Sequence, residues 1–115
     1  MVLWIGFDSQ AEIDAGGDYN WTALHIAAWY GKEAVAAQLL QAGASVSAGD
    51  DYGWTPLHFA ASHGKSSIAN LLLQANASPT AVNKYGRTPA QCAEQRGHGD
   101  LAAMLLEAEQ AAALK

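Results

Sequence analysis

Apolar and polar positions along the chain follow a helical period rather than the alternation of a strand. Ile68, Leu71 and Leu72 are spaced i, i+3 and i+4, which places them on one side of a helix. Leucine pairs recur at 39–40, 72–73 and 105–106, at a constant interval of 33 residues. Alanine is abundant in the segments between these pairs, and it favours closely packed helices over strands. The pattern therefore predicts pairs of helices, one pair for each interval.

The same interval separates the residues that begin and end the predicted helices. Pro56 fits the first helical turn, and His58 can reach back to Thr55 as in a capping box. Asn76 takes the helix-ending position that Gly43 holds one interval earlier. Because catalytic sites are rarely copied at constant spacing, the repeat indicates stacked structural units. Three threonines in one register are good N-caps, and three glycines in another end the first helix of each pair: Thr22, Thr55, Thr88, Gly31, Gly64 and Gly97.

The repeated segments resemble the ankyrin family, whose unit is a β-turn and two antiparallel helices with a T-P-L-H-x-A-A core. Residues 55–61 (TPLHFAA) match this core fully, whereas 22–28 (TALHIAA) and 88–94 (TPAQCAE) depart from it. The turn sequences DDYG and NKYG precede the second and third cores. The resemblance implies an all-α repeat fold, an ankyrin stack of about 3.5 units joined by β-turn tips. We define the predicted units as residues 1–16 (a partial unit, second helix and loop), 17–49 (unit 1), 50–82 (unit 2) and 83–115 (unit 3).

The two ends of the predicted stack differ from its middle. Unit 3 carries charged and polar residues at 94–96, as a C-terminal capping repeat needs, and residues 107–115 can extend its last helix. At the other end, residues 1–9 form a second helix without its first, which leaves Trp4 and Ile5 facing water. A second copy of the chain, a partner or a preceding segment would cover them. A homodimer through this N-terminal edge is the simplest closed arrangement.

Charge and the N-terminal residues limit the classes of partner. The net charge of −5 and the pI of about 5.1 argue against nucleic acid or an anionic membrane surface as partner. The apolar residues 1–7 are too few to span a bilayer and lack the basic start of a secretory signal. Cys92 is the single cysteine, so no internal disulfide can form and a reducing compartment is suggested. We therefore expect a cytoplasmic protein.

A structural role for the repeated Thr and His residues is favoured over a catalytic or metal-binding role. The resemblance implies that His25 and His58 are structural imidazoles that link the turns of adjacent units. His58 and His63 are five residues apart, a poor match to the short helical spacing of metal ligands. Cys92 has no His nearby on its own helix, so a packed thiol is favoured over a nucleophile. With no phosphate-binding loop or nucleophile elbow in the sequence, we predict no catalysis, no metal and no cofactor.

The residues that folding does not explain are aromatic or basic and lie at predicted surface positions. The resemblance implies that turn tips and first-helix ends line a concave surface, and Trp, Tyr and Arg dominate binding energy at protein interfaces. Trp29 is expected beside Tyr30 and His63, and folding is not expected to need it. Stacking of Trp21, Trp54 and Arg87 on one another along the row of turns, with cation–π contact, is the structural alternative, and both roles can hold at once. The predicted partner-binding residues are Tyr19, Trp21, Trp29, Tyr30, Tyr52, Trp54, His63, Tyr85, Arg87 and Arg96.

We predict a non-catalytic protein–protein interaction module that binds another protein through this concave face. An accessory subunit or fragment of a larger ankyrin protein, which inhibits or scaffolds an enzyme, is one alternative. An engineered binder is another, although the framework drifts between GASVSA at 43–48 and NASPTA at 76–81, whereas consensus designs keep it constant. An enzyme is the weakest alternative. The identity of the partner does not follow from the residues.

Overall fold

A computed structural model describes residues 18–113 of the chain. Trp4 and Ile5, on which the predicted dimer depends, lie outside the described residues, so the dimer stays a prediction. Within 18–113 the chain forms six α-helices and a short 3₁₀ turn, and no strand. The all-α class is therefore confirmed. The elements are η1 (Asp18–Asn20), α2 (Ala23–Tyr30), α3 (Glu33–Gln41), α4 (Pro56–Ser62), α5 (Ser66–Gln74), α6 (Pro89–Gln95) and α7 (Gly99–Ala113).

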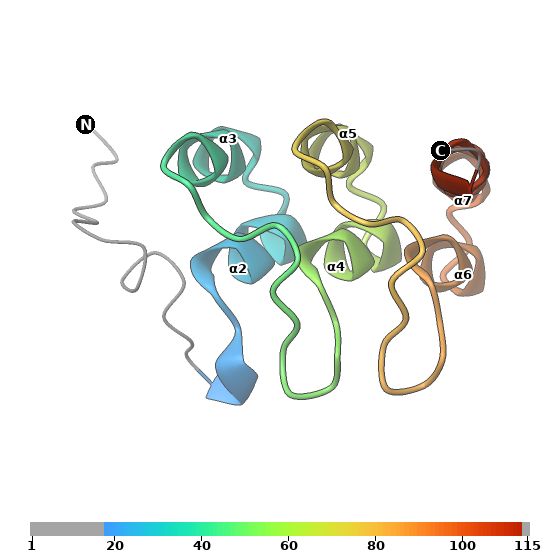
Figure 1. The fold of residues 1–115 in the computed structure, drawn as a ribbon, viewed down its shortest axis with the longest axis horizontal. Coiled ribbons are helices and arrows are strands. Elements are labelled where there is room, and N and C mark those ends of the chain that lie inside the picture. The colour runs from blue at the N-terminus through green and yellow to red at the C-terminus, as the bar shows by residue number, and fades with distance from the viewer. Residues whose placement is uncertain (1–17, 114–115) are drawn as a thin grey trace.

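The helices form two layers, and successive helix pairs lie side by side along the long axis (Figure 1). Helices α2, α4 and α6 make the first layer, in which α4 packs against both α2 and α6. Helices α3, α5 and α7 make the second layer and follow the first-layer helices after short turns. The loops after α3 and α5 run past the first layer to tips that lie at the same edge of the molecule as η1 (Figure 1). This arrangement confirms the predicted stack of helix pairs.

Each first-layer helix begins at a capping box. The Thr55 side chain accepts a hydrogen bond from the His58 backbone N–H, and the imidazole of His58 accepts one from the Thr55 backbone N–H. Thr22 with His25 repeats this geometry. In α6 the same position holds Gln91, whose side-chain oxygen accepts from Thr88 N at 3.0 Å. Two orphan amides are thus satisfied at every start, which explains why helices this short are well defined.

The second-layer helix α5 ends where the chain takes a left-handed conformation at Asn76. Its φ of 72° is close to the region that Gly43 adopts, with φ 92°, after α3. Among residues other than glycine, Asn adopts this region readily, which is why the sequence predicts that it ends the helix. Helix α7 has no such stop and runs for 15 residues, as the sequence allowed.

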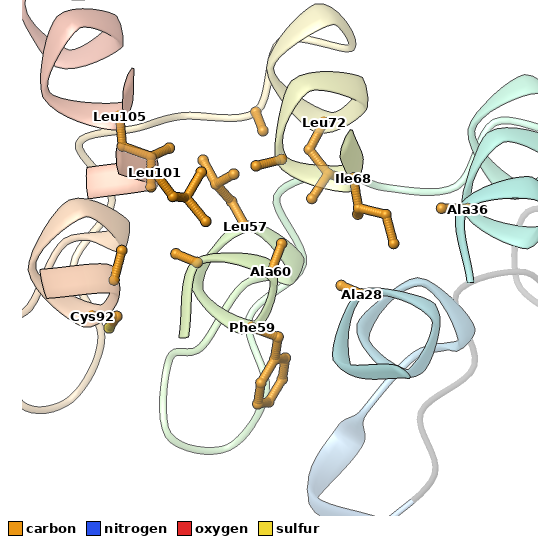
Figure 2. Packing of buried hydrophobic residues seen from close by; sticks show 14 of the residues in the cluster. Ala28, Ala36, Leu57, Phe59, Ala60, Ile68, Leu72, Cys92, Leu101 and Leu105 are labelled. Carbon is orange, nitrogen blue, oxygen red and sulfur yellow. The ribbon is translucent and has the colours of Figure 1, made fainter. Parts of the chain in front are cut away.

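The core lies between the two layers and is built from small and large aliphatic residues (Figure 2). Ala28 and Ala60 are completely buried on first-layer helices, and their small size lets the second layer approach closely. Leu57, Ile68 and Leu72 fill the space between the layers, each with at most 1% of its surface exposed. Full burial of one such side chain contributes about 1.5–3 kcal/mol. The core holds the first-layer helices and their turn tips in a fixed spatial relation.

Candidate partner-binding site

The second and third turn tips are each shaped by one polar side chain. The Asp50 carboxylate oxygen Oδ1 accepts hydrogen bonds from the backbone N–H of Tyr52 at 2.8 Å and of Trp54 at 2.9 Å. In the next tip, the side-chain oxygen of Asn83 accepts from the backbone N–H of Tyr85 at 2.9 Å and of Arg87 at 3.1 Å. The short side chains of Asp and Asn place an oxygen within reach of the backbone amides two residues on, as in an Asx-turn. The tips are therefore rigid, although they are loops.

Backbone hydrogen bonds join neighbouring tips into a row. The Asp51 N–H donates to the Tyr19 carbonyl at 2.9 Å, and the Lys84 N–H donates to the Tyr52 carbonyl at 2.8 Å. The side chains of Tyr19 and Tyr52 face each other with ring centroids 6.0 Å apart. Tyr85, at the third tip, is 60% exposed. The three tyrosines hold equivalent positions of successive tips and remain accessible along one edge.

Two buried histidines each link a turn tip to the preceding first-layer helix: His25 binds the second tip and His58 the third. His25 Nε2 donates to the Trp54 carbonyl at 2.8 Å, and His58 Nε2 donates to the Arg87 carbonyl at 2.9 Å. Because the Nδ1 atoms accept from the capped threonine amides, each ring is the neutral Nε2–H tautomer. Burial lowers the pKa of both imidazoles below 6.5 and outweighs the backbone hydrogen bonds, which raise it. The predicted structural role is confirmed.

An aromatic cluster lies between the tips and the first-layer helices, and Phe59 is at its centre. The Phe59 ring is 5.7 Å from Trp21, 5.3 Å from Trp29 and 5.2 Å from Trp54, measured between ring centroids. Phe59 leaves α4 on the side opposite Leu57 and Ala60 (Figure 2). It is 5% exposed and belongs to the hydrophobic core, so the core extends through the helix layer to this side.

The ring contacts of Phe59 differ from the stacking among turn residues that the sequence suggests as an alternative. Within the described residues no ring contact joins Trp21 and Trp54; instead both contact a shared partner, Phe59, Trp21 edge-on and Trp54 in a stacked arrangement. Arg87 does not stack on Trp54 either, because its guanidinium donates to the side chain of Gln95 at 2.8 Å. The sequence contained a signal for Phe59 that was not used. It is the aromatic residue at the variable position of the T-P-L-H-x-A-A core, where unit 1 has Ile26.

Trp29 lies where adjacent first-layer helices end, as expected, but it is not free of the fold. Its ring is 4.4 Å from the His63 ring and 6.5 Å from the Tyr30 ring. It also contacts Trp21 at 5.5 Å and is half-buried against the core. The ring therefore packs against the fold on one side, and the expectation that folding does not need Trp29 stays a prediction. Tyr30 is the accessible member of the group, with 64% of its surface exposed.

The aromatic cluster walls a hollow of about 310 Å³ that opens between the tips and the ends of the first-layer helices. Of the ten predicted partner-binding residues, six line it. Tyr19 and Tyr30 contact its tryptophan walls, and Tyr85 and Arg87 lie beyond it at the third tip. The lining residues are Trp21, Trp29, Tyr52, Trp54, His63 and Arg96, together with Asp50, Phe59 and Ser62, which the sequence analysis did not select.

Comparison with family models agrees with this geometry. Residues 46–114 match a model described as ankyrin repeats in three copies, and residues 19–51 match a model of the ankyrin repeat. The chain belongs to the ankyrin repeat family. Ankyrin repeats are generally protein–protein interaction modules and are typically not catalytic. A search of curated proteins found no match to the chain.

The remaining reactive side chain of this ankyrin domain is packed rather than presented. Cys92 is 2% exposed on α6, and burial raises the pKa of its thiol. A thiol of this kind is a poor nucleophile at neutral pH. Among residues 18–113 no three His, Cys, Asp or Glu side chains gather as metal ligands, and no helix has the length and apolar character to cross a membrane.

Proposed function

We propose that this chain binds a partner protein through the face formed by its turn tips and first-layer helices, which we call the tip face. The observation that carries the proposal is the hollow walled by three half-buried tryptophans and rimmed by exposed tyrosines. Tryptophan and tyrosine combine large contact area with little rotamer entropy, and they dominate the binding energy of interfaces. No described role in folding requires Tyr30, Tyr52 and Tyr85 to be aromatic.

Preorganisation supports the same proposal. The tips are held by the Asp50 and Asn83 side chains, by the rows of backbone bonds and by His25 and His58. A face held in this way loses little conformational entropy on association, so more of its contact energy appears as affinity. Ankyrin repeats are generally protein–protein interaction modules, which favours another protein as the partner of this face.

Site-specific photo-crosslinking tests the proposal directly. A photoreactive phenylalanine analogue placed at Tyr52 or Tyr85 should capture partner proteins from a lysate of the source cells. The matched control carries the same analogue at Gln38, an exposed residue of α3 in the other layer. Capture from the two tip positions but not from position 38 is the expected result. Capture that is equal from all three positions, or stronger from position 38, would show that the tip face is not the binding surface.

A second variant separates binding from folding. Tyr30→Ala removes a side chain that is 64% exposed, so the unfolding curve should change little. The same change should reduce the yield captured from position 85. If capture is unaffected by Tyr30→Ala, this end of the tip face makes no contact with the partner.

A further inference from the structure

The first two helix pairs line the hollow mainly with aromatic side chains, together with Asp50, Ser62 and His63, and the third pair contributes the cationic Arg96. Arg96 lines the hollow itself. The Nζ of Lys84 lies 5.1 Å from the centre of the Tyr52 ring, which also lines the hollow. Arg87 is held beside them, because its guanidinium bonds to Gln95, the neighbour of Arg96 in α6. In a chain of net charge −5, Arg96 thus lines the hollow, Lys84 contacts one of the lining rings, and Arg87 is bonded to the residue before Arg96.

None of these cations is neutralised by a carboxylate within the described residues. Arg87 donates to an amide oxygen and Lys84 contacts an aromatic ring, so both keep their full charge. Arg96 is exposed, and its guanidinium has no hydrogen-bond or ion-pair partner among residues 18–113. A guanidinium presents paired N–H donors that match a carboxylate in a bidentate contact. The guanidinium N–H donors of Arg96 are therefore available to a carboxylate at the edge of the hollow.

Two acidic residues of the second tip are engaged with the fold. The carboxylate of Asp50 accepts from two backbone amides through Oδ1 and from Trp21 Nε1 at 2.7 Å through Oδ2. Asp51 accepts from the side chain of Asn20 at 2.6 Å. These two carboxylates are therefore bonded within the tips rather than to Arg96. Glu94 is exposed on α6, at the register that Ala61 occupies in α4, and it does not line the hollow.

We propose that the tip face binds an acidic segment of the partner protein that places an aromatic side chain in the hollow and a neighbouring carboxylate on Arg96. Lys84 and Arg87 then meet further acidic residues along the same segment. The hollow, with about 310 Å³, has room for one large side chain, and its walls offer tilted and edge-on contacts to an aromatic ring. This inference rests on the proposed function, since it names the chemistry of the partner at that face.

Peptide selection followed by charge exchange tests the inference. Short random peptides displayed on phage are selected on the immobilised protein, and the dissociation constant of an enriched peptide is measured by fluorescence anisotropy. The enriched peptides should carry a Phe, Tyr or Trp next to Asp or Glu. Arg96→Glu should weaken binding about tenfold or more, as expected for a charge pair at the edge of an apolar anchor. Changing the acidic peptide residue to Lys should weaken binding to the wild type and restore it to the Arg96→Glu variant.

Lys32→Glu is the matched control, because it makes the same change of charge at an exposed residue that does not line the hollow. It should leave the dissociation constant of the peptide nearly unchanged. An equal loss for Lys32→Glu and Arg96→Glu would mean that only the overall charge matters and would overturn the inference. Enrichment of peptides without acidic residues, or of basic peptides, would overturn it as well.

The outcomes also separate this inference from the function on which it rests. If peptides without acidic residues bind the tip face, and Tyr30→Ala or crosslinking at Tyr52 confirms the location, the interaction function stands and the acidic partner is refuted. If neither peptides nor partner proteins contact the tip face, both proposals fail together.

Discussion

At the scale of single residues, the same position of the repeat has different tasks in different units. His25 and His58 cap their own helices and tie down the next tip, whereas Gln91 at the equivalent position caps α6 and is exposed. Phe59 is buried beneath three tryptophans, while Ile26 at the equivalent position is 45% exposed. Burial, rather than residue type, decides which of these side chains the fold depends on.

Stability should depend on pH through the two buried histidines. Their pKa values are lowered in the folded state, so below about pH 6.5 the unfolded chain binds more protons than the folded one. The free energy of unfolding should be greatest above pH 6.5 and fall as the pH drops, by up to about 1.4 kcal/mol per pH unit for each histidine. Urea unfolding at pH values spaced by about 1 unit between pH 5 and 8 measures this slope.

The double variant His25→Gln/His58→Gln is the control for this prediction. Gln91 shows that glutamine can form the same capping box, so the helices should still begin at Thr22 and Thr55. The slope below pH 6.5 should largely disappear. A slope that survives in the double variant would assign the pH dependence to other groups.

Phe59→Ala should be among the most destabilising changes on the tip face. The ring is 5% exposed and contacts three tryptophans, so its removal leaves a cavity and should lower the free energy of unfolding by about 3–5 kcal/mol. Ile26→Ala, at the equivalent position of α2, should cost less than about 1 kcal/mol because that side chain is 45% exposed. Chemical denaturation of both variants makes the comparison, and equal losses would contradict the central position of Phe59.

At the scale of elements, short helices are defined mainly by how they begin and end. The first-layer helices α4 and α6 have seven residues each, too few to be stable in isolation. Their capping boxes mark where they begin, and the positive φ of Gly64 and Gly97 marks where they end. Packing between layers then supplies the free energy that local propensity lacks.

Asn76 tests the importance of a helix end. Its φ of 72° costs an alanine about 1–2 kcal/mol, so Asn76→Ala should lower the free energy of unfolding by about 1 kcal/mol. Asn76→Gly should be neutral or slightly stabilising, since Gly43 already takes this conformation after α3. Asn70→Ala, at an exposed position within α5, is the control and should not destabilise. Thermal unfolding of the three variants would show the order, and a stable Asn76→Ala protein would refute it.

At the scale of the whole molecule, the described chain is a linear stack in which each helix pair contacts its neighbours. Helix α4 packs on α2, α5 and α6, whereas the last part of α7 extends beyond its partner helices with exposed residues at 110–113. In such a stack, stability is the sum of the units and of the interfaces between them. The tip face spans all three pairs, so its shape depends on every interface.

Hydrogen exchange should follow this order along the stack. Amides of α4 should exchange most slowly, because opening them breaks contacts with both neighbouring pairs. Amides at 110–113 should exchange fastest among the helices, since their side chains are exposed. Native-state exchange followed by NMR measures each amide, and uniform protection from α2 to the end of α7 would indicate one cooperative unit instead.

Local rules were enough to predict the helix pairs, the caps and the turns from the residues alone. Thr55 with His58, the glycines in register and Asn76 each act through contacts within a few residues. The interval of 33 residues repeats these signals in three units, which strengthens the prediction. The ten candidate residues were found in the same way, by their register and chemical type. Their role in binding stays a prediction.

Only the tertiary structure decided which of those residues are presented and which are packed. Whether Trp29 is free, and whether Trp21 and Trp54 touch, depends on the position of Phe59, which lies on a different helix pair from Trp29 and Trp21. The hollow, with Arg96 in its lining, likewise arises where side chains of three helix pairs meet. Such contacts depend on distances between segments about 30 residues apart, and periodicity alone carries no information on them.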